Sequence, residues 1–256
     1  MTRRSLFLFA HQDDEYGAAP WILEELESGA DVGCIYLTDG GARIAPAIRD
    51  AESRSVLRSL GVAEDNVAFL DNDGARIADG TLAARSLDGL AMAASWIERN
   101  AWTSSRIYGP SYEGGHPDHD AAHLIAAAIA KQLNALGDAW HFALYNAYRR
   151  AKPFFNVLRQ LPSNAPSRRA QLSASRRLSL TFLCRRYPSQ RRTWLGLLPG
   201  AFVERVLRGR ESVVRFDLTR LNARPHEGEL LYERLFGKTY DEFARDAAAL
   251  VALIDR

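Results

Sequence analysis

The chain has 256 residues, of which 47% are hydrophobic and 25% charged, and this is ordinary for a globular protein with one substantial core. No apolar run approaches the ~20 residues that a membrane-spanning helix needs, and the run that follows the first arginines is too short for a signal peptide, so we expect a cytoplasmic protein. With only two cysteines, Cys34 and Cys184, the chain offers no disulfide framework and no CxxC zinc site. Any metal must therefore be held by imidazole and carboxylate groups.

Charge is unevenly distributed along the chain. Residues 1–130 hold 10 Lys+Arg and 20 Asp+Glu, whereas residues 131–256 hold 23 Lys+Arg and 11 Asp+Glu. The excess of basic residues is greatest in residues 148–210, which hold 15 Lys+Arg and one Asp+Glu. Arginine binds phosphate bidentately, so this segment could contact a phosphate-bearing or lipid-linked sugar, or the surface of an anionic membrane. A solvated surface is the alternative, because the chain uses 30 arginines against three lysines. No nucleic acid partner is expected.

Apolar runs and helical periodicity alternate along the first part of the chain. They predict strands at 5–10, 32–37, 67–70, 106–108 and 140–145, and helices around 21–26 and at 49–60, 82–101 and 118–136. This alternation indicates right-handed βαβ units, and hence a Rossmann-like three-layer α/β fold with a mainly parallel sheet over residues 1–147.

The periodicity weakens beyond residue 147. Residues 160–177 are rich in Ser, Pro and Arg and predict a mobile loop or insertion, while 202–207 and 240–254 have helical character. We interpret 148–256 as a less regular, arginine-rich C-terminal extension that shapes the substrate site, within a single domain spanning 1–256.

Polar residues follow each of the first four predicted strands. In order along the chain they are His11, then Asp39, then Asp71 and Asp73, then His116 and His119. In open parallel sheets ligands bind outside the carboxyl ends of the strands. We therefore expect these loops to converge on one site.

Two segments carry the residue types that zinc prefers. Residues 11–15 (HQDDE) and 116–119 (HPDH) combine imidazole nitrogens with carboxylate oxygens, and two His with one Asp would leave a fourth position open, as in a catalytic zinc site. Taken alone, the first segment could be a solvated acidic turn and the second a helix entry with proline at its first position. Their joint occurrence at strand ends favours a site.

These segments resemble the zinc-dependent PIG-L/LmbE-like deacetylase family. AHQDDE (10–15) and GGHPDHD (114–120) match its two main motifs; TDGG (38–41), RDAE (49–52), LG (60–61) and FLDNDG (69–74) follow in the family's order, and YPSQ (187–190) is a weaker signature. The resemblance covers about residues 5–125. The departure is Gln12, where proline is usual, and it bears on loop shape and substrate fit more than on metal binding.

The resemblance implies a Zn²⁺-dependent removal of the N-acetyl group from an N-acetylglucosamine-type conjugate. It implies that His11, Asp14 and His119 bind one zinc ion, which would bring the pKa of a bound water to around 7. It makes Asp13 the general base and a protonated His116 the group that stabilises the oxyanion and could protonate the departing amine.

Further residues have weaker assignments. Asp73 is the candidate that orients His116, with Asp71 as competitor, although either could simply cap the turn at Gly74. By family analogy Arg49 and Glu52 lie near the substrate; a surface ion pair is the alternative.

Two histidines, His123 and His226, could approach the site, but a buried or capping role is favoured for His123.

Two other classes of function remain open on the sequence. One is a metal-dependent hydrolase of another bond, such as a phosphoester, which a second metal would favour. The other is a non-catalytic protein that binds polyanions or a membrane through the arginine-rich half.

Overall fold

A seven-stranded sheet forms the centre of the molecule. The computed structural model describes residues 3–41, 44–71, 73–103, 105–163 and 165–255. The strand order is β3 (Val67–Phe69), β2 (Asp31–Tyr36), β1 (Arg4–Phe9), β4 (Ser105–Pro110), β5 (Ala139–Phe142), β9 (Ser212–Arg215) and β8 (Ser167–Arg169). The first five run parallel, β9 is antiparallel to β5, and β8 is antiparallel to β9. The predicted α/β fold with a mainly parallel sheet is confirmed.

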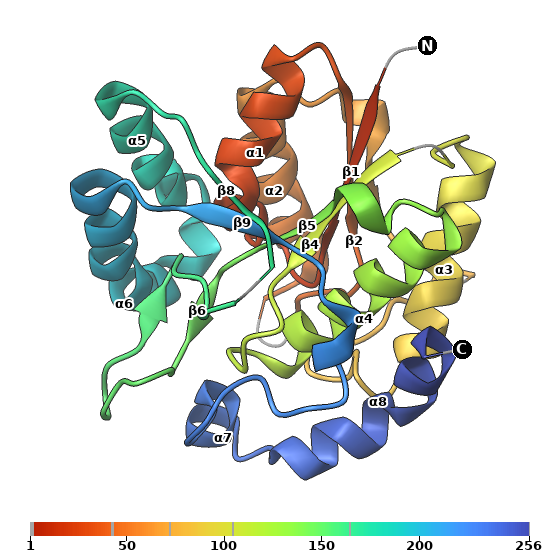
Figure 1. Ribbon diagram of the computed structural model, residues 1–256. Coiled ribbons are helices and arrows are strands. Elements are labelled where there is room, and N and C mark those ends of the chain that lie inside the picture. Colours follow the sequence, from red (N-terminus) through yellow and green to blue (C-terminus); the bar gives the residue numbers. More distant parts are fainter. Residues whose placement is uncertain (1–2, 42–43, 72, 104, 164, 256) are drawn as a thin grey trace.

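Helices cover both faces of this sheet (Figure 1). One face carries α1 (Glu15–Glu27), α2 (Pro46–Leu60), α5 (Ala174–Thr181) and α6 (Arg191–Ala201), and the other carries α3 (Ser86–Arg99), α4 (Pro117–Gln132) and α8 (Tyr240–Ile254). The side chains of β1 alternate between the two cores: Leu6 and Leu8 join the second, Phe7 and Phe9 the first. Burial on both faces explains why β1 is a continuous apolar run.

Shorter elements complete the chain. They are the hairpin strands β6 (Tyr145–Asn146) and β7 (Asn156–Val157), α7 (Leu231–Phe236), the 3₁₀ turns η1 (Glu64–Asn66), η2 (Leu136–Asp138), η3 (Phe182–Arg186), η4 (Pro188–Gln190) and η6 (Leu218–Arg220), and a π-helix, η5 (Phe202–Arg208), that continues α6. Among the described residues, no helix is both long and apolar enough to span a membrane.

The prediction of a loop over 160–177 was wrong in part, and residue 164 lies outside the described residues. This segment contains β8 and the start of α5. Its central residue, Arg168, donates to the Tyr108 hydroxyl at 2.7 Å, pairs with Glu24 at 2.9 Å, and lies over the rings of Trp21 and Trp140. Because this edge strand is held by a cation rather than by apolar side chains, its sequence has no hydrophobic periodicity from which a strand could be predicted.

A second arginine of the basic half is fully buried. Arg205 donates two hydrogen bonds to the Glu211 carboxylate, both at 2.7 Å, and one each to the backbone carbonyls of Leu180 and Tyr16 at 2.9 Å. It therefore ties η5 to α5 and α1, so part of the arginine excess serves the core rather than a partner.

Replacing this arginine should destabilise the fold strongly. Arg205→Ala leaves the buried Glu211 carboxylate without its partner, and we expect the free energy of unfolding to fall by about 3–5 kcal/mol in urea denaturation. The control is Arg58→Ala, which removes the exposed pair with Glu64 at 3.0 Å and should cost roughly 0–1 kcal/mol. Equal losses in the two variants would contradict this account.

Candidate metal centre and catalytic cavity

The site forms where the two central strands end. β1 pairs in parallel with β4, with Phe7 opposite Tyr108, so the loops that follow these strands leave the sheet side by side. The first loop carries His11 and leads into α1, and the second carries His116 and leads into α4. The predicted convergence of these two segments is therefore present.

Three buried side chains meet at this point. His11 Nδ1 lies 3.1 Å from His119 Nε2, which lies 2.9 Å from Asp14 Oδ1. The other oxygen of Asp14, Oδ2, accepts the backbone N–H groups of Ala10 and His11, each at 2.9 Å. For Asp14, burial opposes ionisation, but His119 and His11 outweigh it and lower the pKa to about 2. Asp14 is thus an ionised carboxylate with one oxygen fixed and the other facing two imidazoles.

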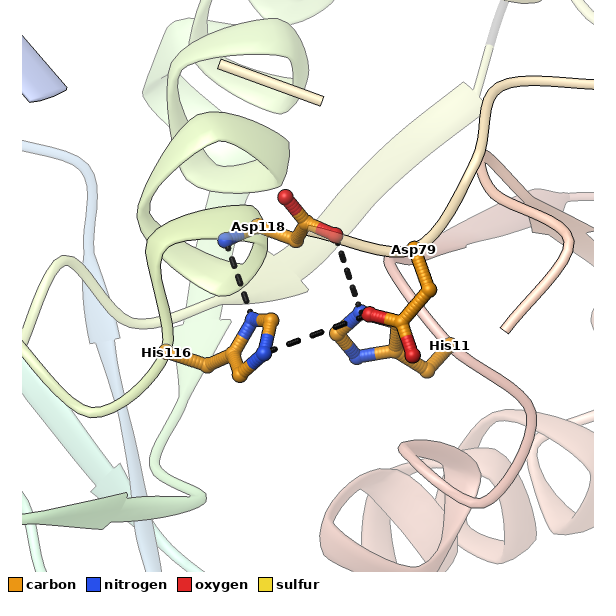
Figure 2. A group of neighbouring side chains, drawn as sticks. All are labelled: His11, Asp79, His116 and Asp118. Atoms are coloured by element: carbon orange, nitrogen blue, oxygen red, sulfur yellow. Dashed lines mark hydrogen bonds and ion pairs between the residues drawn. The ribbon is translucent and has the colours of Figure 1, made fainter. Parts of the chain in front are cut away.

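The second nitrogen of His11 has partners of its own. His11 Nε2 lies 3.1 Å from Asp118 Oδ2 and 3.1 Å from Asp79 Oδ1. Figure 2 shows both carboxylates beside the His11 ring. The Asp118 carboxylate is held by the backbone N–H groups of Gly80 at 2.6 Å and Leu82 at 3.0 Å. Burial opposes protonation of His11, but Asp118 and Asp79 outweigh it and raise the pKa of this ring. When His11 is neutral, a carboxylate acceptor keeps its proton on Nε2, so that Nδ1 would have a lone pair for a metal shared with His119 and Asp14.

Asp13 lies beside this group in a strained turn. Its φ of 109° is unusual for a residue with a side chain, and such conformations cost about 1–3 kcal/mol and cluster at functional sites. Its carboxylate is 3.2 Å from the Arg49 guanidinium, and its backbone N–H donates to Glu15 at 2.9 Å. Burial raises the pKa of Asp13 to about 7, against the lowering effect of Arg49. A carboxyl group with this pKa can exchange a proton near neutral pH.

The imidazole of His116 has a defined tautomer. Its Nδ1 accepts the backbone N–H of Asp118 at 3.1 Å, which caps the N-terminus of α4 (Figure 2). Burial, and after it the proximity of His11, lowers the pKa of His116 to about 3. This pKa favours a neutral ring with its proton on Nε2 over the protonated ring expected from the sequence.

The structure does not bring Asp73 to His116. Asp73 is exposed and lines a separate hollow with Asp71, and the backbone N–H of Gly74 donates to Asp71 at 2.9 Å, which is the turn-capping alternative. Asp79 reaches the histidines instead, 4.0 Å from His116 Nε2.

The path of the backbone after β3 explains this correction. The chain leaves the sheet after Phe69 and rejoins its edge at Ile77, which bridges to Thr38. Asp79 is then fixed, because its backbone N–H donates to Asp39 at 2.9 Å. Asp71 and residues 73–76 lie outside the sheet, so the carboxylate that reaches the site comes later in the chain. The sequence signal that could have indicated Asp79 is the Asp-Gly pair at 79–80, which repeats the Asp-Gly pairs at 39–40 and 73–74.

The two candidate substrate residues on α2 differ. Arg49 lines the cavity described below and also donates to the backbone carbonyls of Gly40 and Gln12. Glu52 lies behind the cavity wall and accepts the backbone N–H of Ser189 at 2.8 Å and its hydroxyl at 2.6 Å. Glu52 thus acts on the site only through Ser189.

Gln12, the departure from the family motif, is buried and structural. Its side-chain amide donates to Asp50 at 2.7 Å, joining the loop after β1 to α2. This contact leaves His11, Asp13 and Asp14 in place.

Neither additional histidine lines the cavity. His123 Nδ1 lies 2.8 Å from the Pro110 carbonyl oxygen in the core, as the buried alternative expects. His226 Nδ1 lies 2.7 Å from the carbonyl oxygen of Glu227.

A cavity of about 880 Å³ opens over these groups. Its polar floor contains His11, Asp13, Asp14, Arg49, Asp79, His116 and His119, and its walls come largely from the C-terminal half: Leu144, Tyr145, Val157, Leu158, residues 188–194, Leu197 and Phe236. A Cβ at Gly115 would overlap the Tyr145 carbonyl oxygen, which explains the glycine directly before His116. The volume is in the range of small-molecule sites.

The donor set fits a divalent metal. His11, Asp14 and His119 offer two imidazole nitrogens and one carboxylate oxygen within 4.8 Å of one another, all buried. Zinc takes such a set and keeps a position open in catalytic sites. Asp118, which lies at His11 Nε2, is the kind of carboxylate partner that a metal-bound imidazole usually has.

Comparisons with known proteins found one family model and several solved structures that are similar to this chain. Residues 6–130 match the PIG-L family model, described as GlcNAc-PI de-N-acetylase, while a comparison with curated proteins found no match. Among solved structures, the zinc-inhibited form of teicoplanin deacetylase aligns with a TM-score of 0.58 and 16% identity over 84% of this chain and 99% of that one. The N,N'-diacetylchitobiose deacetylase from Pyrococcus horikoshii aligns with 0.52 and 16% over 84% and 83%.

The fold itself does not fix the reaction. The 4-carboxy-2-hydroxymuconate hydratase from Pseudomonas putida also aligns, with a TM-score of 0.50 and 14% identity over 83% of this chain and 95% of that one. The family match is more informative, because residues 6–130 include His11, Asp13, Asp14, His116 and His119. Through residues 6–130, just under half of its length, the chain is similar to the PIG-L family.

Proposed function

We propose that the chain is a zinc-dependent hydrolase that removes the acetyl group from an N-acetylglucosamine-type conjugate, releasing acetate and a free amine. The observation that carries the proposal is the group of His11, Asp14 and His119 on the cavity floor with Asp13 beside it. The family description and the deacetylases among the similar structures support the same reaction.

His11 Nδ1, Asp14 Oδ1 and His119 Nε2 would hold the metal. A bound zinc ion would supply Lewis acidity at the acetamide carbonyl and lower the pKa of the attacking water. Asp118 would keep the His11 ring oriented through Nε2.

Asp13 would move the proton in both halves of the reaction. Its carboxylate accepts a proton from the attacking water and can return it to the sugar nitrogen as the C–N bond breaks. Burial raises its pKa to about 7, which suits both roles. Arg49, 3.2 Å away, keeps the carboxylate oriented and would also contact substrate at the cavity wall.

His116 would donate a hydrogen bond from Nε2 to the developing oxyanion. As a neutral imidazole it supplies a donor without supplying a proton, so the departing amine is protonated by Asp13 alone. The backbone N–H of Asp118, which donates to His116 Nδ1 at 3.1 Å, would orient this ring, the role that the sequence analysis gave to Asp73.

The C-terminal half would select the conjugate. Residues 148–256 supply most of the cavity wall, and Arg191 and Arg192 stand exposed on its rim. We expect a conjugate with an anionic group next to the sugar, such as a phosphate, because these arginines can bind it bidentately.

The reaction can be tested with a substrate panel. N-acetylglucosamine conjugates that are free, nucleotide-linked or lipid-linked should release acetate and a primary amine, with anionic conjugates favoured. Asp13→Asn should lower kcat by roughly 10²–10⁴-fold, because it removes the base but keeps the shape. It should retain zinc by mass spectrometry. Full activity in this variant would reject the base assignment, and no acetate release by wild type would reject the function.

The metal ligands can be tested by a pair of variants on α4. His119→Ala removes one of three ligands, so most bound zinc and all but residual activity should be lost. His123→Gln changes a buried histidine four residues further on that does not line the cavity, and it should keep its zinc. Elemental analysis after dialysis distinguishes them. If both variants retain zinc equally, His119 is not a ligand.

The role of His116 can be tested by comparing two replacements. His116→Ala removes the donor and should lower kcat by about 10²–10³-fold. His116→Gln retains an N–H donor and should recover part of that loss at saturating substrate. Equal inactivity of both would instead support proton transfer by an imidazolium.

A further inference from the structure

An exposed apolar stripe runs along the helix that follows the cavity wall. The helix comprises α6 and its π-helical continuation η5, residues 191–208, at the left of Figure 1. Leu195, Val203 and Leu207 are 77%, 38% and 67% exposed, and Pro199 between them is also exposed. Isolated exposed leucines need no explanation, but a row along one helix does.

The geometry of the helix keeps these residues in line. They recur every fourth residue, and in a regular α-helix of 3.6 residues per turn such a row drifts by about 40° per step. The wider turn of the π-helix over 202–208, which contains the step from Val203 to Leu207, offsets part of this drift. Leu195 and Leu207, at opposite ends of the helix, can therefore contact one flat surface together.

Unpaired arginines border the stripe. Arg191 and Arg192 begin the helix, and Arg210 follows it; all three are exposed, and none forms an ion pair with any residue in the described part of the chain. Arg208 is about half exposed. A helix surface with apolar residues in a row and basic residues around it has the composition of helices that lie in the headgroup region of a membrane.

We propose that the outer face of α6 and η5 docks on an anionic membrane surface. The leucines would enter the boundary between headgroups and acyl chains, while the arginines contact lipid phosphates. A second copy of the chain fits less well, because a twofold interface would bring the same arginines together. A nucleic acid would match the arginines but leave the leucines without an apolar partner.

Docking would also place the catalytic cavity at the membrane. The first turns of α6 are part of the cavity wall, through Arg191, Arg192, Trp194 and Leu197. An amphipathic substrate could then present its sugar to the cavity while its apolar part stays in the bilayer. This consequence rests on the proposed function, whereas the docking itself does not.

Vesicle sedimentation tests the docking. The intact protein should sediment with vesicles of phosphatidylcholine and phosphatidylglycerol, much less with phosphatidylcholine alone, and less as salt increases. The double variant Leu195→Glu/Leu207→Glu should bind the anionic vesicles at least roughly tenfold more weakly, because it puts charge where the apolar stripe lies.

A matched variant controls for added charge. Leu87→Glu/Leu253→Glu changes two exposed leucines on α3 and α8, which pack on the other face of the sheet, and it should bind vesicles as wild type does. Unchanged thermal unfolding and zinc content in both variants exclude misfolding.

Three results would overturn the proposal. The first is no sedimentation of wild type with anionic vesicles, and the second is equal loss in both double variants. The third is a wild-type dimer that Leu195→Glu/Leu207→Glu converts to a monomer without any vesicle binding. None of these measurements requires deacetylation, so they fail or succeed independently of the proposed reaction.

Discussion

The parallel pairing of β1 with β4 is the constraint on which the site depends. It brings together two segments that are 108 residues apart in sequence, so that His11 and His119 are within 3.1 Å. Both loops leave the sheet from strands buried on both faces, and the apolar residues of β1 contribute to the two cores in alternation. The polar cluster is therefore held by a large amount of apolar burial rather than by its own contacts, which involve like charges and desolvated imidazoles.

Because of this arrangement, the two ring nitrogens of His11 have different partners. One nitrogen faces His119 and Asp14, and the other faces Asp118 and Asp79. Asp118 in turn is anchored by backbone N–H groups after the β3 excursion, so three loops determine the orientation of one ring. The same residue, Asp118, supplies the N–H that fixes the tautomer of His116.

Local sequence patterns predicted the helices and strands whose own residues show an apolar run or a helical periodicity. The strands and helices of the first 147 residues and the convergence of His11 with His116 and His119 are of this kind, because apolar runs and strand ends are readable along the chain. Asp79 was missed because its position depends on how far the chain travels before Ile77 rejoins the sheet.

Features of the second half depend on distant partners, and this is why sequence patterns did not reveal them. β8 is held by Arg168 through residues of α1, β4 and β5, and Arg205 is buried because Glu211 folds back onto it. An arginine-rich segment predicts exposure, since nothing local distinguishes an arginine in the core from one on the surface. The same applies to Glu52, which was expected at the substrate but binds Ser189 instead.

Helix α2 connects the cavity wall to the Asp13 carboxylate. One turn separates Arg49, which pairs with Asp13, from Glu52, which holds the segment around Ser189. Under the proposed function, a shift of this wall to admit a bulkier sugar would be transmitted through one rigid helix to the guanidinium that lies beside Asp13. Evolution of a new substrate range in this protein would therefore be coupled to its acid–base chemistry, and changes in selectivity and in the pH dependence of turnover should tend to arise together.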